Sequence, residues 1–157
     1  MKRIILLTLV LCLAAGSATA TDTDTAPAAA TATQYGLRGG LTLDPDQFHI
    51  GGHMDLGQIV GDMRLVPNIE VGFGNDQTVV AFNGDLIYDF RESPWSLGGE
   101  LGLNLVDHKD RGSDTDFGLS VLGNYRLGLS SGKTLVLEAK LGLIDSPDVK
   151  LTVGWNF

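Results

Sequence analysis

Few residues of this chain have the types and spacing that a chemical site needs. His49 and His53 lie four residues apart, and Asp55 follows them closely. On a helix this spacing would bring two metal ligands together, but on a strand the two histidines are about 13 Å apart, at about 3.3 Å per residue. We therefore expect no shared metal, and we expect each histidine to form hydrogen bonds inside the protein.

A second candidate is the segment 107–116, DHKDRGSDTD, which contains His108, Ser113 and several Asp residues. Ser, His and Asp can serve as nucleophile, base and orienting acid in an acyl-transfer enzyme. Three such residues also arise easily by chance in a polar loop of this length. We predict no catalytic residue here.

Aspartates are frequent in the polar segments that we expect to connect strands at one end of the fold, its outer end. Oxygen ligands of this kind suit Ca²⁺ or Mg²⁺, but Asp is also common in turns because its side chain bonds to nearby backbone amides. We favour the second explanation and predict neither a metal nor a cofactor. The nine residues are Asp44, Asp46, Asp76, Asp107, Asp110, Asp114, Asp116, Asp145 and Asp148.

The composition excludes several classes of protein. The 157 residues fit one domain, and the net charge of −8 makes the chain a poor partner for nucleic acid. A single cysteine, Cys12, rules out an internal disulfide, and a hydrophobic content of 43% is too high for a disordered chain.

The amino-terminal residues predict export from the cytoplasm. A basic start, an apolar run from 4 to 15 and the small residues Ala18 and Ala20 are typical of a signal peptide, residues 1–20. The apolar run is too short for a membrane-spanning helix, and Leu11 stands where a lipoprotein would carry a small residue before Cys12. Residues 21–34 lack aromatic and branched aliphatic side chains, which predicts a disordered linker before a domain over 35–157.

Within 35–157, apolar residues alternate with glycine and polar residues in run after run. This period of two predicts eight strands, at 35–43, 48–56, 63–73, 80–90, 95–105, 117–127, 135–143 and 149–157. Pro67 cannot donate to a ladder and indicates a bulge or a locally unpaired position. Six apolar residues fall on the polar face, namely Val66, Val79, Ile87, Leu122, Val136 and Ile144.

The polar face suits the inside of a narrow barrel better than a solvated surface. It is rich in glycine, which weakens a strand but leaves room for long charged side chains in a small lumen. Its charges have both signs and can pair with one another. The expected interior polar network comprises Arg38, His49, His53, Asp55, Arg64, Glu70, Asp85, Glu100, Asn124, Arg126, Glu138, Lys140 and Lys150.

The aromatic residues are sorted by their expected height in the barrel. One rim would carry the interface aromatics Tyr35, Tyr88, Phe90, Trp95, Tyr125, Trp155 and Phe157, whereas Phe48, Phe73 and Phe117 fall near the other rim and only Phe82 near mid-height. Two aromatic girdles around an aliphatic band are typical of a lipid-facing wall. We expect the longest connection, 107–116, at the outer rim. We therefore predict an all-β, eight-stranded antiparallel up-and-down transmembrane β-barrel.

The signal peptide, the eight alternating strands and the terminal Gly154-Trp155-Asn156-Phe157 resemble the small outer-membrane β-barrel proteins of Gram-negative bacteria. The OmpA-type transmembrane barrel is similar in architecture, and the resemblance covers 35–157. It implies insertion from the periplasm, with Val153, Trp155 and Phe157 as the signal for the barrel-assembly machinery. No peptidoglycan-binding domain is expected after Phe157.

The function predicted from the sequence is structural, or one of surface interaction, in the bacterial outer membrane. We expect a monomer in contact with outer-membrane lipids and lipopolysaccharide, with an interior closed by polar side chains because an eight-stranded lumen is about wide enough for side chains alone. The alternatives are a lipid A-modifying enzyme embedded in the membrane that uses the 107–116 loop, and a soluble periplasmic lipocalin-like barrel with an apolar ligand.

Overall fold

The computed structural model describes residues 33–110, 112–129 and 132–157, and these residues form strands and loops only. The strands are β1 (Gln34–Leu43), β2 (Gln47–Asp55), β3 (Gln58–Val60), β4 (Met63–Gly74), β5 (Gln77–Asp89), β6 (Trp95–His108), β7 (Gly112–Gly128), β8 (Thr134–Ile144) and β9 (Val149–Asn156). Among the described residues there is no helix with the length and apolarity that a membrane crossing requires. The predicted signal peptide, 1–20, lies outside the described residues, as does most of the predicted linker.

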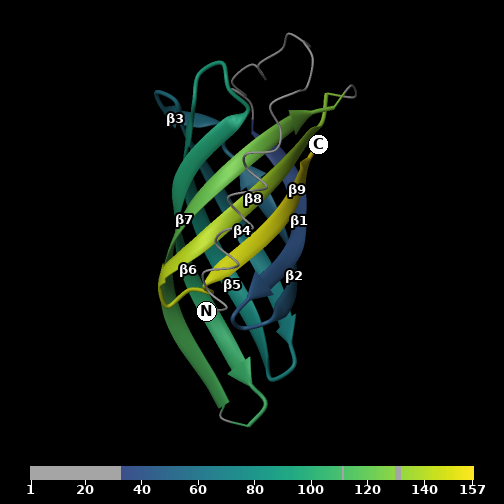
Figure 1. Ribbon diagram of the computed structural model, residues 1–157, viewed down its shortest axis with the longest axis vertical. Helices are drawn as coiled ribbons and strands as arrows, with labels where there is room; N and C mark the ends of the chain where they lie inside the picture. Colours follow the sequence, from purple (N-terminus) through teal and green to yellow (C-terminus); the bar gives the residue numbers. More distant parts are fainter. Residues whose placement is uncertain (1–32, 111, 130–131) are drawn as a thin grey trace, which may run out of the picture.

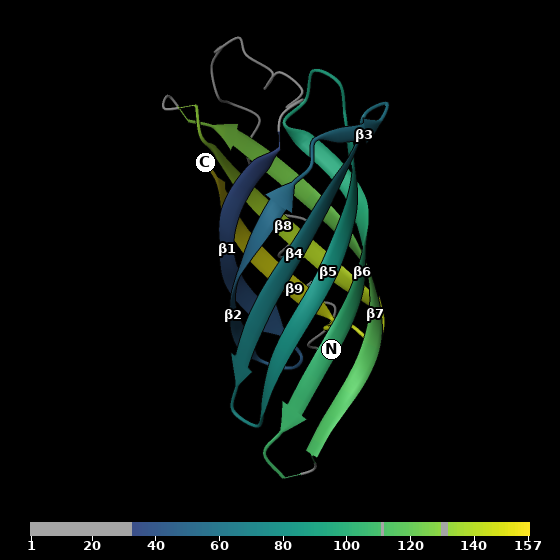
Figure 2. The same cartoon turned by 180° about the vertical axis from the view of Figure 1, so that it is seen from behind.

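Eight of these strands form a closed antiparallel barrel (Figures 1 and 2). Each long strand pairs with its neighbours in the chain, and β1 pairs with β9. The pairing of β2 with β4 closes the ring and leaves the three-residue β3 as a short extension that contacts only β4 among the described strands. The all-β, eight-stranded up-and-down barrel predicted from the alternation is confirmed.

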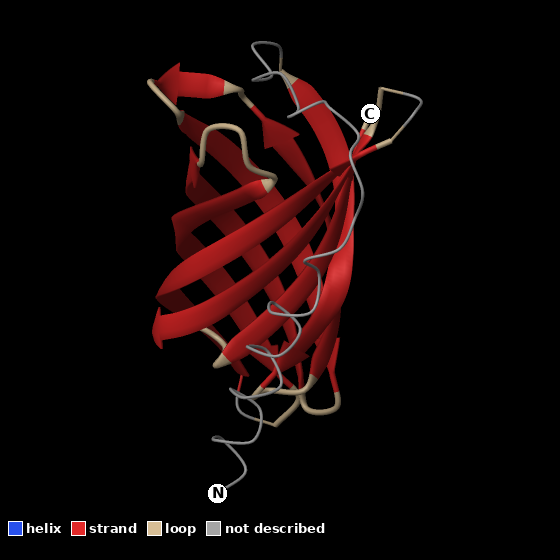
Figure 3. Cartoon of the chain, turned by 45° about the horizontal axis from the view of Figure 1, so that its top comes forward, coloured by secondary structure: helices blue, strands red, loops and turns tan. Residues whose placement is uncertain are grey.

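The two faces of the wall have opposite polarity. Leu37, Leu101 and Phe117 are 63%, 70% and 75% exposed on the outside, whereas Asp85 and Lys140 on the inside are 0% and 1% exposed. Alternation along a strand produces this division, since successive side chains point to opposite faces. The barrel therefore carries its apolar side chains outward and its charges inward. Figure 3 shows the strands that make up this wall.

The segment 107–116, which we expected to be a loop, is mostly part of two paired strands in the structure. Segment 107–116 was predicted to be the longest loop, but β6 runs to His108 and β7 begins at Gly112. Ladder pairs continue up to His108 opposite Gly112, so this hairpin extends at the bottom of Figure 1. The prediction failed because the segment is polar on both faces, and beyond the apolar band nothing requires alternation. At the other limit of the domain, β1 begins at Gln34, one residue before the expected start.

The irregular positions lie near but not always at the expected residues. Pro67 stays in register with Gly84 of β5, but the β2–β4 pairing ends at Asn68. Pro67 therefore lies just beyond the end of the β2–β4 ladder, where its missing N–H costs no hydrogen bond to β2. The expectation of a bulge is wrong for the β4–β5 ladder, in which Pro67 stays in register. A register shift that the sequence did not indicate lies between Leu119 and Ser120, where β7 pairs with β8.

The predicted interface aromatics gather at the end of the barrel where the chain terminates. Trp95 and Tyr125 are cross-strand partners with ring centroids 4.8 Å apart, and Tyr88 lies 5.5 Å from Phe90. Lys133 lies 5.5 Å from the Trp155 ring centroid. We call this end, at the top of Figure 1, the chain-end rim, and the opposite end, with the β1–β2, β4–β5, β6–β7 and β8–β9 connections, the hairpin rim.

Candidate functional site

The centre of the barrel is filled by a connected cluster of charges, which we call the plug: Arg38, Glu70, Asp85, Glu100, Glu138, Lys140 and Lys150. Arg38 Nε lies 2.8 Å from Glu70 Oε1, and the same guanidinium also pairs with Asp85 and Glu138. Lys140 Nζ lies 3.1 Å from Asp85 and 3.3 Å from Glu138. These charges come from six different strands, so the plug ties the wall together across the lumen.

Removing charges from water is costly, and only dense pairing offsets that cost. In the plug each buried cation contacts more than one carboxylate, except Lys150, which pairs with Glu70. The side-chain amide of Asn68 donates a hydrogen bond to Asp85 at 3.1 Å, and that of Asn83 donates one to Asn68 Oδ1 at 2.9 Å. A network satisfied to this degree holds its members in one arrangement.

A second cluster lies nearer the chain-end rim. Arg64 Nε donates to Asp89 at 2.6 Å, and the same guanidinium pairs with Asp55. Arg126 approaches Asp89 at 3.8 Å. Next to these charges, Val66, Ile87 and Leu122 form a small buried apolar cluster. These three residues break the alternation because they fill the lumen, and together with the charges they leave a space of only about 30 Å³ here.

The two inward histidines form hydrogen bonds with different partners. His49 lies between two hydroxyls, with Nδ1 3.2 Å from Thr42 and Nε2 3.1 Å from Thr152. His53 Nε2 lies 2.7 Å from Asn156 Oδ1. Each ring is thus a hydrogen-bonding member of the interior. Among the described residues, no group of three or more His, Cys, Asp or Glu is placed to hold a metal ion.

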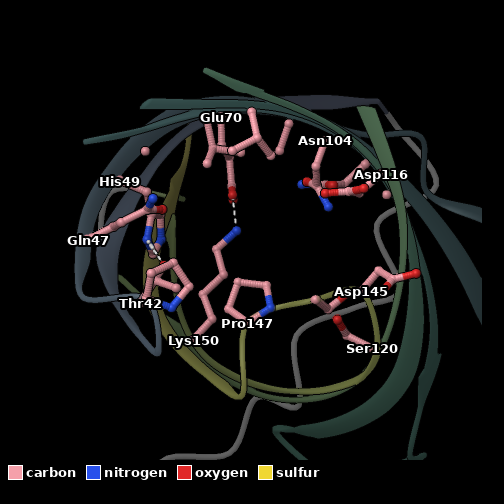
Figure 4. A pocket seen from close by; sticks show the side chains of 18 of the residues that line it. Thr42, Gln47, His49, Glu70, Asn104, Asp116, Ser120, Asp145, Pro147 and Lys150 are labelled. Carbon is pink, nitrogen blue, oxygen red and sulfur yellow. Dashed lines mark hydrogen bonds and ion pairs between the residues drawn. The ribbon is translucent and has the colours of Figure 1, made fainter. Parts of the chain in front are cut away.

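Between the plug and the hairpin rim the lumen is open, with a cavity of about 290 Å³ that we call the outer cavity (Figure 4). Glu70, Glu100, Lys140 and Lys150 form its floor. The wall includes small or apolar residues such as Gly102, Ala81 and Val106. Because these side chains are short, they leave the charged floor open to the cavity.

The β8–β9 turn folds inward over the outer cavity. Ser146 and Pro147 line the cavity, and their neighbours Gly118 and Gly142 on β7 and β8 leave the room for them. A Cβ on Gly142 would lie 2.7 Å from Ser146 O, closer than real Cβ atoms approach a carbonyl oxygen. The backbone N–H of Asp148 donates to Asp44 O at 3.3 Å, which fixes the turn to the β1–β2 connection.

The candidate catalytic residues do not come together. Ser113 Oγ donates to Asp107 Oδ1 at 3.3 Å on the outside of the β6–β7 hairpin. His108 lines the outer cavity and lies 3.9 Å from Asp114. Since Asp107 pairs with Ser113 and precedes His108 on the same strand, the hydroxyl and the imidazole point to opposite faces of the hairpin. A nucleophile and its base must be within hydrogen-bond reach, and these two groups are not.

An exposed ion pair on the chain-end rim contrasts with the plug. Arg91 Nε donates to Asp62 Oδ2 at 2.9 Å, and this hydrogen bond raises the pKa of Arg91. Surface pairs of this kind contribute little to stability because water and salt screen them.

The structure brings most of the expected interior residues together in the two clusters, with His49 and His53 in separate hydrogen bonds. Asn124 is 2% exposed and its amide, in the orientation that satisfies its neighbours, donates to Glu138 at 3.1 Å. Asp89, Asn68, Asn83, Thr42 and Thr152 were not among the expected network residues but make polar contacts inside. All five stand at alternate positions on the polar face, so the period of two already marked them. The expected assembly residues Val153, Trp155 and Phe157 all point outward.

Comparison with known proteins places the fold among transmembrane barrels. The chain is similar to the crystal structure of Neisserial surface protein A (NspA), with a TM-score of 0.61 and 18% identity over 79% of this chain and 94% of that one. It also matches the solution NMR structure of the de novo designed TMB2.3, with a TM-score of 0.42, 18% identity, and coverage of 80% and 90%. No protein-family model and no curated protein sequence matches the chain. The likeness to NspA supports the fold, which is that of an eight-stranded transmembrane β-barrel.

Proposed function

We propose that this chain is an integral protein of the bacterial outer membrane with a structural or surface-interaction role, exported by a cleaved signal peptide. The observation that carries the proposal is the polarity of the wall, which exposes Leu101 and Phe117 and buries Asp85 and Lys140. In water each Å² of exposed apolar surface would cost about 25 cal/mol. In a bilayer the same surface contacts acyl chains, and a closed barrel leaves no unpaired strand edge.

The proposed partners follow from the same surface. Outer-membrane lipids and lipopolysaccharide would contact the apolar band, and the aromatic residues of the chain-end rim suit the interface on the periplasmic side. We propose that Val153, Trp155 and Phe157, which face outward on the last strand, present the assembly signal to the barrel-assembly machinery. The protein would act as a monomer because its ring of strands is already complete.

We further propose that the barrel does not conduct. The outer cavity ends on the plug, and the space on the other side of the plug is about 30 Å³. In a planar bilayer the wild-type protein is expected to give no steady conductance. Stable single-channel steps from the purified protein would show that the plug leaves a continuous path.

Two other functions receive less support. A soluble lipocalin-like barrel would hold an apolar ligand inside, but the outer cavity has a charged floor and the leucines point outward. A lipid A-modifying enzyme in the 107–116 segment would need Ser113 and His108 on one face of the hairpin, where the structure separates them.

The experiment that tests the location combines fractionation with gel mobility. We expect the protein in the outer-membrane fraction, soluble only in detergent, and migrating differently before and after boiling because the closed barrel resists the detergent used in the gel. Recovery in buffer without detergent, with one mobility at all temperatures, would contradict the proposal.

A further inference from the structure

The β6–β7 hairpin leaves one strand edge open at the hairpin rim. Ladder pairs join β7 to β6 as far as Gly112, but the pairing of β7 with β8 begins only at Leu119. β8 ends at Ile144, and the turn that follows it folds inward over the outer cavity. Among the described residues, no strand therefore pairs with 112–118 on the side away from β6. Figure 1 shows this hairpin extending below the β8–β9 turn.

The open edge presents backbone groups at every second residue. The N–H of Arg126 donates to Pro94 O on the β6 side, and the register between β6 and β7 continues without a shift down to Gly112. Since hydrogen-bonded pairs alternate along an antiparallel ladder, the even-numbered residues of β7 bond to β6 and the odd-numbered ones point away from it. The residues that direct their N–H and C=O groups to the open side are Ser113, Thr115 and Phe117.

This stretch is accessible from water. All six residues from 112 to 117 are exposed, whereas Asn104 and Val106, which lie opposite on β6 and have β5 on their other side, are half-buried and buried. Segment 112–116 is polar on both faces, so it extends beyond the apolar band of the wall. An open edge of this kind is a template on which an extended chain adds a further strand through main-chain hydrogen bonds.

The charges of the edge disfavour a second copy of this chain as the added strand. In a two-fold antiparallel pairing centred on Thr115, Asp114 of each copy would lie opposite Asp116 of the other. Like charges directly opposite one another destabilise a strand pair. Asp145 lies close by, because a Cβ on Gly118 would be 3.1 Å from its carbonyl oxygen. A strand with basic residues facing these aspartates is therefore the complementary partner.

The outward face at the base of the edge is apolar. Phe117, Leu143 and Ile144 are 75%, 59% and 55% exposed there. Leu119 pairs with Ile144, so a strand that continues the sheet from the point where β8 leaves would place its own outward side chains beside Phe117. Pairs of an aromatic and a β-branched residue across two strands are favourable. The outward residues of the partner are thus expected to be apolar.

We propose that the open edge of β7, residues 112–118, binds an extended segment of another protein in which basic residues alternate with apolar ones. The segment takes the place beside β7 that β8 leaves empty. Its main chain bonds to the odd-numbered residues of the edge, and its basic side chains lie opposite Asp114 and Asp116. This inference names a partner for the surface-interaction role proposed above and rests on that role.

The first test titrates a seven-residue peptide of alternating lysine and valine into the purified full-length protein in detergent, with amide hydrogen exchange followed by NMR. We expect saturable binding that slows exchange at least about tenfold at Ser113, Thr115 and Phe117, because only their N–H groups gain a partner. The amides of Asp114 and Asp116 already bond to β6 and should change little. The absence of saturable binding, or equal slowing at odd and even residues, would overturn the proposal.

Two further peptides separate backbone pairing from charge. A glutamate–valine peptide brings like charges opposite the aspartates and should bind at least about tenfold more weakly. A lysine–valine peptide with methylated backbone nitrogens keeps the charge but has no N–H donors, and it should bind at least about fivefold more weakly. Binding of either peptide as tight as that of the first would contradict strand addition.

Variants then locate the edge. Thr115→Pro removes an N–H from the open side without a loss of bonding to β6, and it should weaken the lysine–valine peptide at least about fivefold. Asp116→Asn should weaken it at least about threefold. Asp76→Asn makes the same charge change on the exposed β4–β5 connection and should have less than about a 1.5-fold effect. Equal effects of the two Asn variants, or wild-type affinity in the Pro variant, would contradict the site.

Folding is checked by the gel-mobility shift, which each variant must retain. If Thr115→Pro loses the shift, the methylated peptide on the wild-type protein decides the same point. Failure of the lysine–valine peptide to bind a protein that keeps the shift would overturn this inference alone, since fractionation tests the membrane location independently. Slowed exchange at the odd-numbered residues that grows with protein concentration, without peptide, would identify a second copy as the occupant and overturn the choice of partner.

Discussion

The two halves of the barrel interior differ although the same eight strands line both. Towards the hairpin rim the lumen holds a cavity of about 290 Å³, whereas towards the chain-end rim only about 30 Å³ is free. The difference lies in side-chain size. Gly72, Gly102 and Ala81 line the open half, and Arg64, Ile87 and Leu122 fill the other.

This comparison shows that the number of strands fixes the width of the lumen but not whether it is filled. An eight-stranded barrel is about wide enough for side chains, so short residues at inward positions leave space and long ones close it. Each half is therefore suited to a different role: the packed half supports the wall, and the open half can accept a solute. The predictions below test this division.

The largest effect is expected where the plug loses its central cation. Lys140→Met leaves Asp85, Glu100 and Glu138 without its ammonium group and should lower the free energy of unfolding by about 3–5 kcal/mol. Denaturant unfolding in lipid vesicles, followed by tryptophan fluorescence, measures it. Lys133→Met is the matched control: it removes the same group near Trp155 on the outside, where about 0.5–1 kcal/mol is expected. Similar losses in both variants would mean that the plug does not stabilise the barrel.

A smaller effect distinguishes the two halves by apolar truncation. Leu122→Ala opens a void in the packed cluster and should cost about 2–4 kcal/mol. Val106→Ala enlarges a cavity that already exists and should cost less than about 1.5 kcal/mol. The same unfolding measurement compares them. If the Val106 variant loses as much as the Leu122 variant, the outer cavity is packed in solution and the division is wrong.

Adding a methyl group should also destabilise the packed half more than the open half, with a smaller loss of unfolding free energy than the truncations give. A Cβ at Gly98 would overlap the backbone Leu86 O and lie 3.0 Å from Ile87 Cα, so Gly98→Ala should cost about 1–3 kcal/mol. A Cβ at Gly102 would lie 2.6 Å from Asn83 Oδ1 and 3.9 Å from Asn104 Oδ1, and the Asn83 amide is the end of a side chain that can move into the cavity. We expect less than about 1 kcal/mol for Gly102→Ala. The reverse order would indicate that the chain-end half is the more adaptable one.

No effect on lipids is expected from a change of His108, the last residue of β6. His108→Ala removes a side chain at the wall of the outer cavity, on the opposite face of the hairpin from the Ser113 hydroxyl, so the lipid A acylation pattern seen by mass spectrometry should be unchanged. Loss of an acylation product in this variant, with the barrel still folded, would establish the enzyme that the structure does not favour.

Much of this fold was predictable because alternation is a local property. The period of two assigned Asp85, Glu100 and Lys140 to one face, and the excess of glycine on that face pointed to a narrow interior. Asp89 and Asn68 carried the same signal and were overlooked. The pairs themselves, such as Arg38 with Glu138, depend on which strands face each other across the lumen, and neither residue order nor composition specifies that arrangement.

The outer cavity was not predictable in this way. Its boundary includes the turn at Ser146 and Pro147, which lies against Gly142 of β8 and is bonded to the β1–β2 connection, and alternation within one strand does not indicate such contacts. The extension of β6 and β7 into segment 107–116 was missed for a related reason. Backbone pairing there continues without the apolar contacts that make alternation visible in a sequence.

The central claim, that the wall faces lipid with its apolar side, is tested most directly by spin labels at two positions of β6. In a Cys12→Ser background, Leu101→Cys and Asn104→Cys place labels on opposite faces of that strand, and electron paramagnetic resonance in lipid vesicles measures collisions with oxygen and with a water-soluble nickel complex. The account predicts that the Leu101 label meets oxygen and is shielded from nickel, whereas the Asn104 label meets nickel. A Leu101 label as accessible to nickel as the Asn104 label would contradict it.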